Sequence, residues 1–349
     1  ATKWSAKKTV LILMVLWSLS AMSIAFVQTK TQFMVARFFL GIFEGGVWPA
    51  VLVLLATWFP QKERARANAF WMCCLPISAV VMAPLTGWLL TFLTWRTVFI
   101  IEAMPPLIWA FVWYYKIADS PAKAKWASPA ERKFVEESIA AENVGKTQNV
   151  GYVKACTNKT VILLILAYFC WMSGFYGYTM WVPSVIKSFN GIGSGAVGVL
   201  TAVPFIFAGI AMVINSAHSD KTQEREMHVA LPLIVGAIGL IGGQYLATTP
   251  VVKMIFLCIT AIGVYAPYGP FWAIPTRVLR PEVAGVAMGL INALGNLGGF
   301  FGPYLVGYIK TVSSGYMGFV VLAGFLLVTS ITCVVLKKTK ISTEKNLSA

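Results

Sequence analysis

The chain has 349 residues, of which 58% are hydrophobic and only 12% are charged, and its mean hydropathy is +0.74. This composition excludes a soluble globular protein. The formal net charge of +15 would suit a nucleic-acid-binding protein. The basic residues, however, stand in segments between long apolar runs. We therefore attribute the charge to membrane topology and expect no nucleic-acid partner.

Ten apolar runs are long enough to cross roughly 30 Å of hydrocarbon as helices. Lipid offers the backbone no hydrogen-bond partners, so spans must be helices or a closed barrel, and runs of this length exclude a barrel. The sequence therefore predicts an all-α integral membrane protein. The expected spans are residues 9–27, 33–59, 66–91, 97–117, 160–187, 196–217, 228–247, 251–275, 283–309 and 315–336.

The distribution of basic residues predicts the orientation of the chain. If the spans alternate from a cytoplasmic N-terminus, 22 of the 28 Lys and Arg residues fall on the cytoplasmic side and five fall outside. Cytoplasmic segments of membrane proteins carry such an excess of positive charge. We therefore expect a multi-pass protein of the cell membrane with both ends of this chain in the cytoplasm.

The second span contains two charges, in the segment Arg37-Phe-Phe-Leu-Gly-Ile-Phe-Glu44. Seven residues make almost two helical turns, so both side chains project from one face, roughly 10 Å apart along the axis. A charge at this depth costs at least about 2.5 kcal/mol, and it normally faces a partner or a water-filled cavity. The pair is either a structural tether between helices or a substrate-anion site with a proton carrier, and we favour the second interpretation.

Glu102 is a second acid within a predicted span. It could titrate during transport, but it lies just before Pro105-Pro106, where a helix is expected to kink. We favour a structural hydrogen-bonding role.

Residues 119–159 form a long basic segment that separates a first bundle, 1–118, from a second bundle with a cytoplasmic tail, 160–349. Within it, Ser128-Pro-Ala-Glu131 is typical of a capping box with Pro at the first helical position. We expect a short amphipathic helix from there to about Glu142, on the cytoplasmic face.

The second bundle holds two tyrosines, Tyr176 and Tyr178, in a glycine-rich stretch. A helix interrupted there could unwind and line a cavity. The alternative, that the hydroxyls only cap exposed carbonyls, is equally open.

The loop after the span at 196–217 contains Asp220, Lys221 and Arg225, which we interpret as an acid–base turn that acts in gating. His218 and His228 flank this loop, and no clustering of the two is expected. The six cysteines lack metal-ligand spacing. We predict no metal, no cofactor and no disulfide.

Several motifs together resemble the major facilitator superfamily, and within it the anion:cation symporter family that includes sialin-type and bacterial sugar-acid permeases. The motifs are Arg37-Phe-Phe-Leu-Gly-Ile-Phe-Glu44-Gly, Trp58-Phe-Pro-Gln-Lys-Glu-Arg-Ala-Arg-Ala-Asn68, Trp95-Arg96, Ile101-Glu102-Ala-Met-Pro105, Tyr176-Gly-Tyr178, Trp181-Val-Pro183 and Asn292-Ala-Leu-Gly-Asn296-Leu-Gly-Gly. The resemblance implies a fold of two helical bundles, with ten of the usual twelve transmembrane helices present.

The resemblance also implies roles for individual residues. Arg37 would hold a substrate carboxylate, and Glu44 would bind the coupling proton. Trp272 and Asn292 match positions that contact substrate in sugar-acid members, and Asn296 belongs to the same motif. Leu75 stands where that branch carries glutamine, which weakens the case for a galactonate-like ligand and admits a less polar acid.

The predicted function is proton-coupled import of a small organic anion, such as a sugar acid or aromatic monocarboxylate, by alternating access. A membrane sensor of the same anion and an organic-anion exchanger are the alternatives. Motifs of hydrolases, metalloproteases and nucleotide-driven pumps are absent from the sequence, so an enzyme is not expected. We expect a monomer in the lipid bilayer.

Four spans before the long loop and six after it are unequal, although transporters are commonly built from similar halves. We therefore predict that this chain lacks the first two helices of the fold, and that an intact gene encodes about 80 more residues with two further spans.

Overall fold

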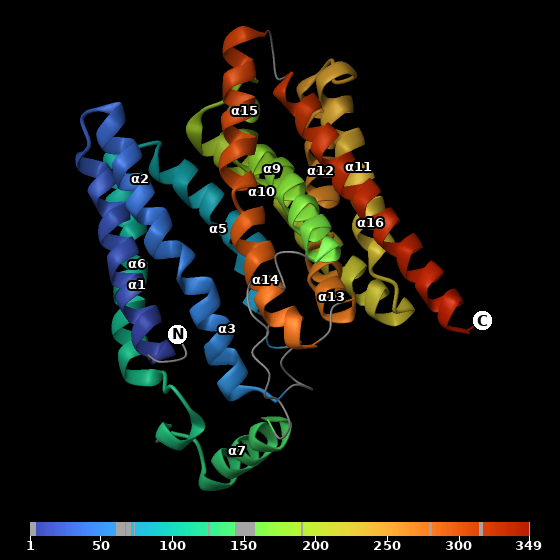
Figure 1. The fold of residues 1–349 in the computed structure, drawn as a ribbon. Coiled ribbons are helices and arrows are strands. Elements are labelled where there is room, and N and C mark those ends of the chain that lie inside the picture. Colours follow the sequence, from blue (N-terminus) through green and yellow to red (C-terminus); the bar gives the residue numbers. More distant parts are fainter. Residues whose placement is uncertain are drawn as a thin grey trace. The chain divides into compact units, whose positions relative to one another are not determined.

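The computed structural model describes residues 5–60, 67, 71–72, 74–124, 126–143, 158–189, 191–278, 281–313 and 317–348. Every regular element in these ranges is helical (Figure 1). The elements are α1 (Ala6–Ser23), η1 (Ile24–Phe26), α2 (Lys30–Gly45), α3 (Val47–Trp58), α5 (Cys74–Leu89), α6 (Trp95–Lys116), η2 (Pro121–Lys123), α7 (Pro129–Asn143), α9 (Lys159–Lys187), α10 (Ser194–Thr222), α11 (Glu226–Tyr245), α12 (Pro250–Tyr265), α13 (Tyr268–Val278), α14 (Pro281–Gly295), α15 (Gly298–Val312) and α16 (Gly318–Ser348).

Within the described residues, eight helical segments are long and apolar enough to cross a membrane. The predicted spans at 66–91 and 283–309 are not among them. The first is described mainly as α5, an apolar helix of 16 residues, because parts of 61–73 lie outside the described residues. The second is divided into α14 and α15, of 15 residues each. The all-helical membrane class is confirmed, whereas the count of ten spans stays a prediction.

The chain divides into two compact units, which we describe separately. Unit 1 contains residues 1–74 and 88–147, and unit 2 contains residues 75–87 and 148–349. In unit 1, α1 packs against α2, α3 and α6. The buried residues at this junction are Val10, Met14, Ala50 and Ala110.

One carboxylate organises the beginning of α1. Asp119, just after α6, accepts hydrogen bonds from the Ser5 hydroxyl at 2.7 Å and from the Lys7 backbone N–H at 2.9 Å. It thereby caps the helix N-terminus, where unpaired N–H groups and the helix dipole favour a negative charge. The first turn of α1 has no acidic residue of its own, and Asp119 supplies one from a distant part of the chain.

In unit 2, α9 packs against α10, α12, α14, α15 and α16 (Figure 1). Of the two alternatives left open for Tyr176 and Tyr178, an unwound helix is not found, because α9 is continuous from Lys159 to Lys187. Its glycines serve close packing instead. A Cβ on Gly174 would stand 2.4 Å from Leu326 of α16, and one on Gly177 would stand 2.4 Å from Leu322. The interruptions lie elsewhere, between α12 and α13 and between α14 and α15.

Residues 75–87 of α5 belong to unit 2 because they pack against α10. A Cβ on Gly87 would lie 2.8 Å from the Cα atom of Gly198, so the two backbones nearly touch. The sequence-based division assigned all of 1–118 to a first bundle. Its boundaries at 118 and 159 stay a prediction.

The predicted amphipathic helix is present as α7. Its capping box is complete: the Glu131 N–H donates to the Ser128 hydroxyl oxygen at 3.2 Å, and the Ser128 N–H donates to the Glu131 carboxylate at 2.9 Å. The hydrogen bonds from the Ser128 backbone and side chain hold the pKa of Glu131 below its usual value.

Candidate functional site

In unit 1, both predicted charges lie on α2, which is an uninterrupted helix between them. Arg37, Gly41, Glu44 and Gly45 follow at the spacing of one helix face. Both charged side chains are exposed in unit 1. No atom of another described element lies within 4 Å of where a Cβ would stand on either glycine. This face therefore presents a cation, an acid and open space between them.

The Arg37 side chain is oriented by aromatic rings. Its guanidinium carbon lies 5.5 Å from the ring centroid of Phe33 and 5.9 Å from that of Phe99 on α6. Guanidinium groups are attracted to aromatic faces at such distances. A guanidinium can in addition form two parallel hydrogen bonds to a carboxylate.

Glu102 lies on α6, three residues before the proline pair, and is half-buried. Its assignment as a structural acid or a second titrating group stays a prediction.

A groove of about 590 Å³ also lies in unit 1, between α1 and α2, but its chemistry does not suit an anion. Neither Arg37 nor Glu44 lines it. Its walls are mainly apolar and are formed by Leu16, Leu19, Ser20, Ser23, Phe26, Val27, Thr31, Gln32, Val35, Ala36, Phe39 and Phe43.

In unit 2, the candidate residues gather around Tyr168 of α9. Its ring stacks on Phe271 with centroids 5.2 Å apart, and it meets the edge of Trp272 at 5.1 Å. It also lies directly on Gly295 of α14, where a Cβ would stand 2.2 Å from the tyrosine ring. The Tyr168 hydroxyl is within hydrogen-bonding reach of the Asn296 amide. Tyr168 therefore contacts α13, which follows the interruption after α12, and α14, which precedes the interruption before α15.

Trp272, on α13, has an indole nitrogen that is buried and without a hydrogen-bond partner in the described structure. An unpaired N–H in a low-dielectric region costs about 1–3 kcal/mol. A ligand that offers an acceptor oxygen would remove this cost. The role of Trp272 in substrate binding stays a prediction.

Asn292 lies in the last turn of α14, and Asn296 directly follows the helix, four residues later. The Asn296 amide donates to the Asn292 side-chain oxygen at 2.9 Å and to the Asn292 backbone carbonyl at 2.8 Å. The pair keeps the Asn292 amide N–H₂ group in a defined direction. The structure therefore groups three of the predicted substrate residues, Trp272, Asn292 and Asn296, around one tyrosine.

Tyr176 and Tyr178 differ in their surroundings. Tyr176 is half-buried and lies on Gly299 of α15, where a Cβ would stand 2.8 Å from its ring. Tyr178 has no exposed surface, and its hydroxyl donates to the Leu257 carbonyl of α12 at 2.7 Å. The Tyr178 hydroxyl therefore has a backbone partner. The substrate-binding roles of Tyr176 and Tyr178 both stay predictions.

Sequence analysis did not single out Tyr168. The feature of the sequence that could have pointed to Tyr168 is its position two helical turns before Tyr176 on the same helix. The partners that give it importance come from α13 and α14, about 100 or more residues away along the chain. A local pattern does not reveal such contacts.

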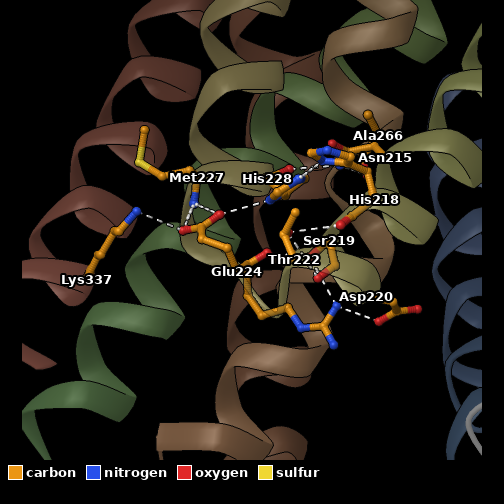
Figure 2. A network of polar contacts seen from close by, with 11 residues as sticks. Asn215, His218, Ser219, Asp220, Thr222, Glu224, Met227, His228, Ala266 and Lys337 are labelled. Atoms are coloured by element: carbon orange, nitrogen blue, oxygen red, sulfur yellow. Dashed lines mark hydrogen bonds and ion pairs between the residues drawn. The ribbon is translucent and has the colours of Figure 1, made fainter. Parts of the chain in front are cut away.

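The predicted gating loop joins α10 to α11 in unit 2 (Figure 2). The guanidinium of Arg225 pairs with Asp220 and donates to the Ser219 hydroxyl at 3.1 Å. Lys221 is exposed. Gln223 ends α10 in the left-handed region, with a φ of 56°, which makes the reversal tight.

The expectation that the two histidines do not cluster is wrong. The tight reversal brings Nδ1 of His218 to 2.6 Å from Nε2 of His228. Nδ1 of His228 in turn lies 2.9 Å from the Glu224 carboxylate, which Lys337 of α16 contacts at 3.2 Å on its other oxygen. Figure 2 shows Glu224 between Lys337 and His228.

Glu224 also serves as a cap for α11, accepting a hydrogen bond from the Met227 N–H at 2.8 Å. Burial by itself raises the pKa of the Glu224 carboxyl. The bonds from Met227, His228 and Lys337 act in the opposite direction, and the net pKa lies below its usual value. Glu224 is therefore a negative charge at neutral pH.

Comparison with known proteins settles the family. The sequence model described as "Major Facilitator Superfamily" matches residues 1–303. The chain belongs to the Major Facilitator Superfamily. This membership makes it a membrane transporter and not an enzyme.

Three relatives illustrate the similarity. Two proteins of Agrobacterium vitis, each named "Putative tartrate transporter", are 35% and 37% identical to this chain; the alignments cover 93% of it and 74% and 77% of the relatives. The "Quinolone resistance transporter" of Acinetobacter baumannii is 28% identical over 93% of this chain and 78% of its own.

Among solved structures, the "D-xylose-proton symporter" superposes with a TM-score of 0.71 at 15% identity, covering 94% of this chain and 80% of that one. This superposition confirms the fold expected from the sequence motifs.

Proposed function

We propose that this protein is a proton-coupled symporter that imports a small hydroxylated dicarboxylate of the tartrate class by alternating access. The observation that carries the proposal is the open face of α2, with Arg37 and Glu44 on either side of Gly41. A guanidinium and an acid on one face of a spanning helix provide an anion site and a proton site.

The acid beside the cation explains how anion and proton movements are linked. Arg37 favours the ionised form of Glu44, whereas binding of a substrate carboxylate to Arg37 removes that influence. Protonation of Glu44 and occupation of Arg37 by the anion then favour each other. This reciprocity is the thermodynamic requirement for symport.

The neutral residues of unit 2 support the choice of a hydroxylated substrate. The unpartnered N–H of Trp272 and the oriented amide of Asn292 are donors suited to hydroxyl or carboxylate oxygens. The tartrate-named relatives point to the same class. Tartrate is shorter than a six-carbon sugar acid and requires fewer hydrogen bonds, which agrees with Leu75 in place of the glutamine of sugar-acid members.

Uptake of labelled L-tartrate into proteoliposomes tests this function. We expect accumulation above the external concentration when the outside is made acidic, and collapse of that accumulation when a protonophore is added. D-xylose and a fluoroquinolone serve as competitor controls and should not inhibit.

Three results would point elsewhere. Tartrate binding without any transport would indicate a sensor. Exchange of internal for external tartrate with no response to the pH gradient would indicate an exchanger. Export of the fluoroquinolone, with no response to tartrate, would contradict the substrate class.

A further inference from the structure

Unit 2 contains a histidine pair that the proposed substrate mechanism does not use. The chain has two histidines in total, and their ring nitrogens meet at 2.6 Å although one lies on α10 and the other on α11. His218 is exposed, whereas the His228 side chain is only 14% exposed. An outer ring in contact with water is thus linked directly to an inner one.

The hydrogen-bond partners determine how many protons the pair can hold. Because Glu224 is a carboxylate, Nδ1–H of His228 must donate to it. In the neutral ring, Nε2 of His228 is then an acceptor, and Nδ1–H of His218 donates to it. One further proton can be taken up on the exposed nitrogen of His218 without disturbing any contact. A second added proton would bind Nε2 of His228. Two N–H groups would then face each other, and the hydrogen bond between the two rings would break.

We propose that His218 and His228 form a second proton-binding site of this transporter, which takes up one proton with the network intact and releases the α10–α11 loop from its partners when it takes up a second. The effect of loop release on transport rests on the proposed function. The proton-binding site itself rests only on the geometry of unit 2.

The surroundings of the pair determine the effect of each proton. Glu224 faces His228 from the loop, Lys337 faces Glu224 from α16, and Glu226 lies buried at the start of α11. Arg225 is directed to Asp220 and Ser219 instead. One added proton is therefore balanced by Glu224. After a second proton is bound, both rings are cations, and His228 competes with Lys337 for the Glu224 carboxylate.

The backbone of His228 is fixed independently of its ring. The Asn215 amide donates to the His228 carbonyl at 2.9 Å and to the Ala266 carbonyl at 2.8 Å. These bonds tie α10, α11 and the end of α12 together. A change in protonation therefore acts on side-chain contacts of the loop and of α16, and leaves the helices packed.

The presence of only two histidines makes the pair directly observable. Protein labelled with ¹⁵N-histidine, reconstituted in nanodiscs after removal of any affinity tag, reports on these rings alone. We expect two coupled steps in the NMR signals of the two rings, because ring nitrogens in direct contact take up protons as a pair. His218→Gln and His228→Gln should each show one step. Two steps in the wild type at the same midpoints as in the single variants would overturn the proposal.

Two matched acid-to-amide variants test the counter-charge. Glu224→Gln should move the first step to lower pH, because the protonated pair loses its balancing carboxylate. Asp220→Asn alters the neighbouring acid, whose side chain is 71% exposed and paired with Arg225, and should leave both steps unchanged. Equal shifts in the two variants would mean that only the general negative charge matters, which would overturn the specific network.

Exchange of L-tartrate across proteoliposome membranes tests whether releasing the loop affects transport. We expect the exchange rate to change about two- to fivefold over the pH range in which the second proton binds, a size that fits partly exposed polar contacts. In both histidine variants the exchange rate should no longer depend on pH in this range. An unchanged dependence would overturn the role of the pair in releasing the loop. Absence of tartrate exchange in the wild type would count against the proposed function alone, since the NMR titration does not require transport.

Discussion

The candidate residues of the two units differ in charge and in packing. On α2 of unit 1, Arg37 and Glu44 are ionisable, exposed and separated by open space. Around Tyr168 of unit 2, the residues are neutral and held by neighbouring rings and amides. A charge in a spanning segment must keep access to water or a counter-ion, whereas a neutral donor can be fixed by packing. The predictions below test each unit by itself: the charged residues of unit 1 as an anion and proton site, and the neutral donors of unit 2 as partners of hydroxyl or carboxylate oxygens.

The largest expected effect is that of Arg37. Arg37→Ala should weaken tartrate binding by at least about 30-fold, since loss of one partner of a charged pair costs 2 kcal/mol or more. Arg37→Lys should be nearly as harmful, because an ammonium does not reproduce two parallel bonds to a carboxylate. Isothermal titration of the purified variants measures both.

Arg96→Lys provides the matched control. Arg96 bonds to the Val27 carbonyl at 3.2 Å and covers Trp95, so binding should remain within about twofold of wild type. Native affinity in Arg37→Lys would show that a point charge is sufficient, and would contradict the carboxylate clamp.

Glu44 tests whether unit 1 also carries the proton. Glu44→Gln should abolish accumulation driven by a pH gradient while counterflow exchange persists, because the amide keeps the shape of the site and removes the titration. Glu102→Gln, at the half-buried acid of α6, should retain accumulation. If the two variants show the reverse pattern, Glu102 is the coupling acid.

The indole of Trp272 tests the neutral site. Trp272→Phe keeps an aromatic ring and removes the unpartnered N–H, so we expect tartrate affinity to fall about five- to tenfold, the value of one hydrogen bond. Trp171→Phe removes an N–H that already donates to the Val264 carbonyl at 2.9 Å. It should lower Tm and leave affinity unchanged; a loss of affinity equal to that of Trp272→Phe would contradict the assignment.

Two tyrosines of α9 test selectivity. Tyr168→Phe removes the hydroxyl near Asn296, and it should reduce the preference for tartrate over succinate about two- to fivefold, because hydroxyl recognition is loosened. Tyr178→Phe should keep the preference and reduce thermal stability, because the Leu257 carbonyl loses its donor. Competition uptake and a thermal-shift assay distinguish the two effects.

The smallest expected effect concerns Glu224. Its pKa is lowered in the folded protein, so its contribution to stability is complete above its unfolded value of about 4.5 and is lost as the pH falls through the folded value. Wild type should therefore lose Tm more steeply than Glu224→Gln on acidification below that pH. Solvent screening limits the difference to less than about 1 kcal/mol. Parallel slopes would contradict the stabilising role.

Patterns along the chain predicted what depends on local chemistry. Hydropathy predicted the membrane class, and Ser128 and Glu131 predicted the start of α7, because capping involves residues three apart. The common helix face of Arg37 and Glu44 followed from the helical period.

Contacts between distant segments account for what was missed. The glycines of α9 left an interrupted helix open as one alternative, but they contact leucines of α16, more than 100 residues later in the chain. The meeting of His218 and His228 depends on the left-handed conformation of Gln223, which its residue type does not indicate.

The glycines of α15 that contact α9 also indicate where unit 2 is stiff. Gly302 of α15 lies so close to Ser173 that an added methyl group would overlap the serine carbonyl, and Gly298 is similarly close to the same turn. Backbones in direct contact resist sliding and tilting, because no side chain can rearrange between them. We therefore expect unit 2 to bend at the interruptions between α12 and α13 and between α14 and α15. Trp272 and Asn296 lie beside these two hinges, so the residues expected to bind substrate are also those placed to bend the unit when it binds.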